Sequence, residues 1–93
     1  MSAETVKHLR IHGMVQGVGY REAMRAKAYE LGITGWVRNC RDGSVEAVVA
    51  GSSAAVQRMI AWSQRGPPVA RVERVEINDS AGSFTRFERW PTA

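Results

Sequence analysis

The chain reads Gly13-Met14-Val15-Gln16-Gly17-Val18-Gly19-Tyr20-Arg21 between an apolar, strand-like segment and a helix-like one. Glycines at positions 13, 17 and 19 permit positive φ angles and let a ligand approach the main chain closely. The helix expected just beyond them offers free N–H groups and a positive dipole end. Arg21 adds a forked cation in the first helical turn. Together these features predict a cradle for a phosphate or carboxylate, with a glycine-rich turn that binds nothing as the alternative.

This loop differs from the familiar nucleotide-binding loops. It lacks the Gly-Lys-Ser/Thr ending of an NTPase loop and the G-x-G-x-x-G spacing of a dinucleotide-binding fold. No Ser or Thr that could bind magnesium follows it. The loop is therefore not predicted to be either kind of nucleotide-binding loop.

Hydrophobic periodicity on both sides of the loop predicts the remaining elements. The strands are expected at 6–12, 33–39, 44–50, 69–77 and 85–90, and the helices at 20–31 and between Gly51 and Gly66. Alternation slips between Val72 and Val75, which predicts a β-bulge. The order β-α-β-β-α-β with an extra edge strand predicts an α+β, ferredoxin-like (split βαβ) sandwich, an antiparallel sheet with two helices on one face.

Composition sets the broad class. With 93 residues, of which 44% are hydrophobic, we expect a single folded domain over 1–93 with its core at about 6–90. No apolar run approaches the roughly 20 residues of a membrane helix, and no secretory signal is visible, so a cytoplasmic protein is expected. The net charge of +4 favours anionic ligands without choosing among phosphates, nucleic acids and membrane surfaces.

The histidines and the single cysteine do not predict a metal site. His8 and His12, on one strand, would lie about 13 Å apart, too far to share a zinc ion, and are expected to face solvent. Cys40 has no second cysteine to pair with and is expected to be a small loop residue. The chain has three tryptophans, Trp36, Trp62 and Trp90, which could stack on RNA bases. Residues 45–49 hold no RNP1-like aromatic run, so we prefer the interpretation that the tryptophans pack within the fold.

Asn39 closes the strand expected at 33–39, just before the turn Cys40-Arg41-Asp42-Gly43. An asparagine at a strand end commonly hydrogen bonds to local backbone. Alternatively, its amide projects both a donor and an acceptor toward a ligand in the first loop. The residues alone leave both interpretations open.

Two segments closely resemble the signatures of the acylphosphatase family. The first signature is Gly, any residue, Val-Gln-Gly-Val, any residue, Phe or Met, then Arg, and residues 13–21 depart from it only at Tyr20. The second runs from Gly35-Trp36-Val37-Arg38-Asn39 to later glycines and a valine, all of which are present. These later positions are Gly43, Val45 and Gly51. The resemblance covers about 6–90.

The resemblance implies the same ferredoxin-like sandwich and hydrolysis of the carboxyl–phosphate anhydride bond of acyl phosphates. By motif position, the catalytic residues are Arg21, which binds the phosphate, and Asn39, which positions the attacking water. The predicted phosphate-binding residues are Gln16, Gly17, Val18, Gly19, Tyr20 and Arg21. Tyr20 keeps the aromatic body of the family residue, but its hydroxyl needs a partner if it is buried.

We expect no metal and no cofactor. The expected partners are a small-molecule acyl phosphate and inorganic phosphate, which would be both product and competitive inhibitor. We expect a monomer that binds neither membrane nor nucleic acid. The rival hypotheses are a non-catalytic module that binds phosphate or carbamoyl phosphate, and a ferredoxin-like RNA-binding domain.

Overall fold

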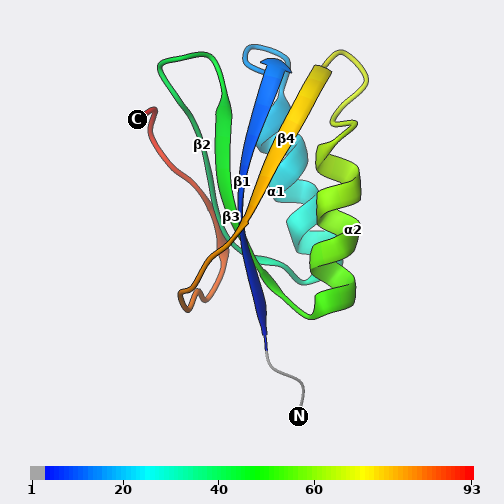
Figure 1. Cartoon of the computed structure of the whole chain (residues 1–93), viewed down its shortest axis with the longest axis vertical. Coiled ribbons are helices and arrows are strands. Elements are labelled where there is room, and N and C mark those ends of the chain that lie inside the picture. Colours follow the sequence, from blue (N-terminus) through cyan, green and yellow to red (C-terminus); the bar gives the residue numbers. More distant parts are fainter. Residues whose placement is uncertain (1–3) are drawn as a thin grey trace.

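The computed structural model describes residues 4–93 as a five-stranded sheet with two helices (Figure 1). The strands are β1 (Thr5–Met14), β2 (Thr34–Asn39), β3 (Val45–Gly51), β4 (Arg71–Asp79) and β5 (Phe87–Arg89); the helices are α1 (Tyr20–Leu31) and α2 (Ser53–Ser63). The strand order is β4-β1-β3-β2-β5. Both helices cover the same face of the sheet, so the predicted α+β ferredoxin-like sandwich is confirmed.

The direction of the last strand corrects the sequence prediction. Strands β1 to β4 pair antiparallel, but β5 pairs parallel to β2, so the sheet is mixed. Because β4 and β5 occupy opposite edges, the chain between them crosses from one side of the sheet to the other. Alternation of apolar residues indicates which face a side chain takes, not the direction in which its strand runs.

Local sequence sets the helix ends. Gly19 precedes α1 in the left-handed region with φ 77°, and Gly32 follows α1 at φ 69°, where its N–H donates to the last-turn carbonyls. The hydroxyl of Ser52 accepts a hydrogen bond of 3.1 Å from the N–H of Ala55 and caps α2. The predicted helix boundaries at these residues are confirmed.

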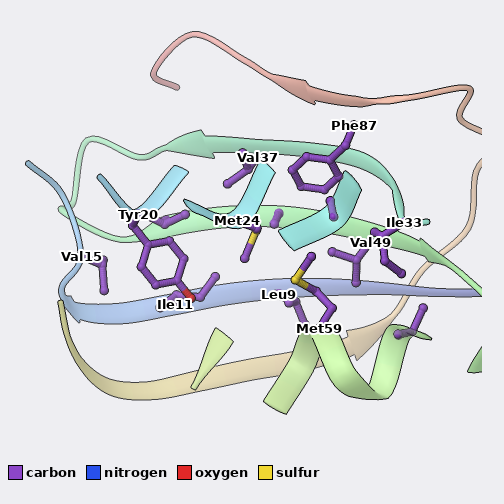
Figure 2. Packing of buried hydrophobic residues seen from close by; sticks show 14 residues of the cluster. Leu9, Ile11, Val15, Tyr20, Met24, Ile33, Val37, Val49, Met59 and Phe87 are labelled. Atoms are coloured by element: carbon purple, nitrogen blue, oxygen red, sulfur yellow. The ribbon is translucent and has the colours of Figure 1, made fainter. Parts of the chain in front are cut away.

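The core lies between the helices and the sheet (Figure 2). Leu9 and Ile11 of β1 are fully buried, as are Met24 of α1 and Met59 of α2. Removing each of the two β1 side chains from water stabilises the fold by about 1.5–3 kcal/mol. This packing fixes the positions of the loops at the sheet end that carry the site.

The predicted β-bulge is confirmed and explains Gly13. The register between β1 and β4 shifts after His12, so that Gly13 faces Val72. A Cβ on Gly13 would lie 2.1 Å from the carbonyl oxygen of Arg71. Gly13 therefore allows the close approach of the two strands.

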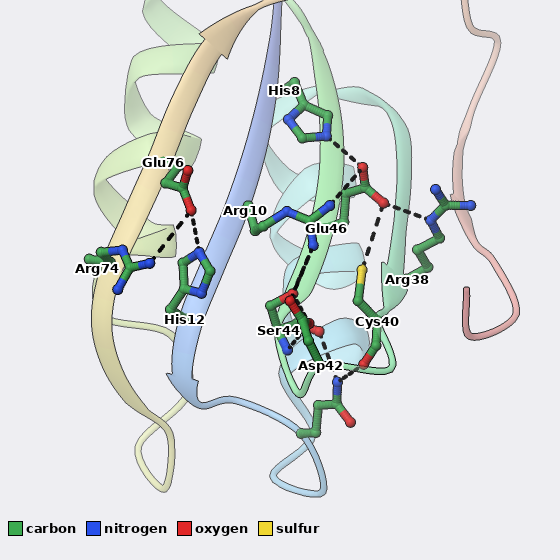
Figure 3. A network of polar contacts seen from close by, with 11 residues as sticks. His8, Arg10, His12, Arg38, Cys40, Asp42, Ser44, Glu46, Arg74 and Glu76 are labelled. Carbon is green, nitrogen blue, oxygen red and sulfur yellow. Dashed lines mark hydrogen bonds and ion pairs between the residues drawn. The ribbon is translucent and has the colours of Figure 1, made fainter.

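The helix-free face of the sheet carries a polar network rather than an open, solvated surface (Figure 3). Glu46 of β3 is 9% exposed and contacts His8 at 2.7 Å and Arg38 at 2.8 Å. Burial opposes the charge of the Glu46 carboxyl, but the hydrogen bonds with His8 and Arg38 outweigh it and lower its pKa. Cys40 is buried beside this carboxylate, with its Sγ 3.7 Å from Glu46 Oε1.

Aromatic packing accounts for the tryptophans. Trp36 and Trp90 stack with their ring centroids 4.2 Å apart, and the Arg38 guanidinium lies 5.0 Å from the Trp36 centroid. Trp62 packs against Tyr20 at 5.4 Å. The predicted packing of the three tryptophans is confirmed. Within residues 4–93, no helix is long and apolar enough to cross a membrane.

Candidate active site

The glycine-rich loop between β1 and α1 (residues 15–19) and the carboxyl end of β2 meet at one end of the sheet. Strands β1 and β2 both run antiparallel to β3, so the carboxyl ends of β1 and β2 lie at the same end of the sheet (Figure 1). The side-chain amide of Gln16 donates to the carbonyl oxygens of Cys40 and Ser44, each at 2.8 Å. Gln16 thus fastens the loop to the β2–β3 turn.

A small cavity of about 90 Å³ opens where these segments meet. Its lining residues are Val15, Gly17, Gly19, Tyr20, Arg21, Glu22, Asn39 and Arg89. Pockets for drug-sized ligands are roughly 300–1,000 Å³. This volume suits a single small anion better than a nucleotide.

Arg21 is a partly buried cation without a carboxylate partner among the described residues. The other four partly buried Lys and Arg side chains, Lys7, Arg10, Lys27 and Arg38, each face a carboxylate. A guanidinium in this state retains all five of its N–H donors. Arg21 is therefore available to bind an anion in the cavity.

The start of α1 adds backbone donors to the same cavity. Gly19 makes no side-chain cap, and α1 begins at Tyr20 directly beside the cavity. The N–H groups of a first helical turn have no partner within the helix and carry the positive end of its dipole. Loop and helix start therefore offer donors that converge with Arg21.

Asn39 carries an unsatisfied polar atom in the cavity wall. Its Oδ1 is buried and has no hydrogen-bond partner among residues 4–93. The alternative that its amide bonds local backbone is therefore not supported by the described contacts. A buried carbonyl oxygen without a partner can accept a hydrogen bond from a water molecule or a ligand.

Of the other predicted phosphate-binding residues, Gly17 and Gly19 line the cavity, whereas the side chains of Gln16, Val18 and Tyr20 do not serve it directly. The Tyr20 hydroxyl donates to the carbonyl oxygen of Ser63 at 2.6 Å, which supplies the partner it was expected to need. Burial raises the pKa of this phenol well above its usual range. The side chain of Tyr20 thus belongs to the core, and neither Gln16 nor Val18 lines the cavity.

Glu22 and Arg89 also line the cavity, although neither is predicted as a site residue from the sequence. Arg89 Nη1 donates to Glu22 Oε1 at 2.8 Å, and Arg25 lies 3.7 Å from the same oxygen. The hydrogen bond from Arg89 holds the pKa of the Glu22 carboxyl below its usual range. Glu22 could have been noticed because it follows Arg21, whereas Arg89 reaches the site only through sheet pairing.

No metal-binding cluster is found in the described part of the chain. Residues 4–93 hold no group of three or more His, Cys, Asp or Glu side chains arranged to bind an ion. His8 pairs with Glu46, and His12 pairs with Glu76 on the neighbouring strand (Figure 3). The histidines are thus part of the polar network on the helix-free face.

Comparison with known proteins places this arrangement in a family. The acylphosphatase sequence profile matches residues 7–89. An acylphosphatase of Thiobacillus denitrificans is 54% identical over 82 residues, covering 88% of this chain and 92% of its own. The structure of an acylphosphatase from Coxiella burnetii superposes with a TM-score of 0.90 at 38% identity, covering 94% of this chain and 93% of its own. For an acylphosphatase from Bacillus subtilis the TM-score is 0.88 at 28% identity, with coverage of 95% and 99%. The chain therefore belongs to the acylphosphatase family and is an enzyme of that family.

Proposed function

We propose that this enzyme hydrolyses the carboxyl–phosphate anhydride bond of acyl phosphates without a metal ion. The observation that carries the proposal is the convergence of three unsatisfied groups on one 90 Å³ cavity. These are the first-turn N–H groups of α1, the Arg21 guanidinium, which has no carboxylate partner among residues 4–93, and the buried Oδ1 of Asn39.

Arg21 and the loop N–H groups would bind the phosphoryl group. Phosphoryl transfer passes through a loose transition state whose charge lies on the equatorial oxygens, so positioning and electrostatic stabilisation account for most of the catalysis. The leaving group is a carboxylate, a weak base that needs no proton from the protein. A cradle of fixed donors is therefore sufficient on the phosphate side.

Asn39 would hold the attacking water through its Oδ1. An amide does not accept a proton usefully at neutral pH, so Asn39 orients the water and does not deprotonate it. The carboxylate of Glu22 belongs to a residue that lines the cavity, but its contact with Arg89 lowers its pKa and makes it a poor base. We therefore assign the water proton to an oxygen of the substrate phosphate.

Hydrolysis of benzoyl phosphate in the presence and absence of EDTA tests the proposed function. We expect release of benzoate and inorganic phosphate at a rate that the chelator does not change, with inorganic phosphate as a competitive inhibitor. Binding of phosphate or carbamoyl phosphate without turnover would instead indicate a binding module. Loss of turnover with EDTA, restored by a divalent ion, would contradict the metal-free route.

The position of bond cleavage provides a second test. If water attacks phosphorus, hydrolysis in ¹⁸O-labelled water must place the label in inorganic phosphate and leave benzoate unlabelled. Mass spectrometry of both products after a single turnover measures this directly. Label in benzoate would mean that water attacks the carbonyl carbon, and the roles given to Arg21 and Asn39 would be wrong.

A further inference from the structure

Arg89 is a second arginine at the cavity, brought there by the parallel edge strand. In the pairing of β5 with β2, Phe87 lies opposite Gly35 and Arg89 lies opposite Val37. Phe87 and Val37 are both buried in the core, so Arg89 stands over the same, helix-covered face of the sheet. Asn39 follows Val37 by two residues on that face, at the cavity end of β2.

Glu22 holds this guanidinium from the first turn of α1. The contact is made by Nη1 of Arg89 alone, at 2.8 Å from Glu22 Oε1. No second hydrogen-bond partner of Arg89 is found among residues 4–93, so its remaining N–H donors stay available. One nitrogen of the Arg89 guanidinium is thus anchored, and Arg89 lines the same cavity as Arg21.

The proposed reaction creates two anions, and the cradle accounts for only one. The phosphoryl oxygens face the α1 N–H groups and Arg21, whereas the second negative charge develops on the carboxylate that departs. Resting on the proposed function, we propose that Arg89 is a further catalytic residue that binds the oxygens of the leaving carboxylate, positioned for this by Glu22.

The step balances without another reactant. The water oxygen forms a new bond to phosphorus, and the bond between phosphorus and the bridging oxygen breaks. Its electron pair remains on that oxygen, which becomes part of the carboxylate next to the Arg89 guanidinium. One proton of the water stays on the attacking oxygen and the other moves to a second phosphate oxygen, so the products are a carboxylate and inorganic phosphate.

A purely structural clamp between β5 and α1 predicts a different kinetic result. A cation that stabilises the leaving carboxylate helps a basic leaving group more than an acidic one, because more charge needs stabilisation at the basic one. Removing this cation should steepen the dependence of rate on leaving-group basicity. Removing a clamp would lower the rates for all substrates by the same factor.

The test is a series of ring-substituted benzoyl phosphates, from strongly electron-withdrawing to electron-donating substituents, assayed with wild type and Arg89→Gln. We expect Arg89→Gln to lower kcat/KM about 10- to 100-fold for the most basic leaving group and less than about fivefold for the most acidic one. Arg89→Lys keeps a charge with fewer donors, and we expect an intermediate slope. Glu22→Ala leaves Arg89 unanchored and should also give an intermediate slope.

Arg86→Gln is the matched control, because Arg86 precedes β5, is exposed and lies outside the 90 Å³ cavity. Its slope should equal that of wild type. Equal slopes in wild type, Arg89→Gln and Arg89→Lys would overturn the role of Arg89 and leave the proposed function intact. Failure of the wild type to hydrolyse any member of the series would overturn both. If Arg89→Gln does not fold, as judged by circular dichroism, the slope of Arg89→Lys decides, and a wild-type slope there contradicts the proposal.

Discussion

Replacing Arg21 with glutamine is expected to lower kcat/KM for benzoyl phosphate about 10³-fold, as expected when a positioned cation is lost from a phosphoryl-transfer site. The partly buried guanidinium faces the cavity without a carboxylate partner among the described residues. Glutamine keeps hydrogen-bonding capacity but removes the charge, so both ground-state binding and transition-state stabilisation decline. Steady-state kinetics should show a higher KM together with a lower kcat.

Arg58→Gln is the control for this substitution. Arg58 is exposed on α2, away from the cavity, and its replacement changes the net charge of the chain by the same amount. Its kinetics should match those of wild type. Arg21→Lys should recover part of the activity, because the charge returns without the bidentate fork. Near-normal turnover by Arg21→Gln would exclude Arg21 as the phosphate ligand.

Replacing Asn39 with alanine is expected to lower kcat about 10²-fold and to change KM less than about threefold, the size of effect that follows from misplacing a reacting group. Asn39 lines the cavity, and its buried Oδ1 has no hydrogen-bond partner among residues 4–93. Its loss removes the group that orients the water while the phosphate cradle stays in place. Single-turnover rates and phosphate affinity separate the two effects.

Asn78→Ala provides the comparison, because Asn78 is an exposed asparagine on β4, the edge strand opposite β5. It should leave both kinetic constants unchanged. A large rise in KM with unchanged kcat in Asn39→Ala would instead assign Asn39 to substrate binding. The water-positioning role would then be wrong.

Much of the fold could be predicted because local physics determines it. Left-handed glycines end or begin α1 where the apolar stripe does, and the slip between Val72 and Val75 marks the bulge opposite Gly13. The parallel direction of β5 could not be predicted, since residue alternation is the same in either direction. The burial of Glu46 was also missed, because the long side chains that cover it come from neighbouring strands.

The candidate site shows the same division. Residues 13–21 and Asn39 carry motifs, and the fold brings Gly17, Gly19, Tyr20, Arg21 and Asn39 to one cavity. The side chain of Gln16 lies in the same loop but bonds the β2–β3 turn, a contact that spacing does not reveal. Arg89 reaches the cavity through the pairing of β5 with β2, two strands distant in sequence, and no local sequence pattern predicts this.

The most direct test of the central claim is a titration of ¹⁵N-labelled protein with inorganic phosphate, followed by amide chemical shifts. We expect saturable shifts that are largest at the backbone of residues 17–21 and at the side-chain amide of Asn39. The dissociation constant should equal the inhibition constant of phosphate against benzoyl phosphate hydrolysis. Shifts concentrated at His8 and His12 on the helix-free face, or no saturable shift in the loop, would contradict the central claim.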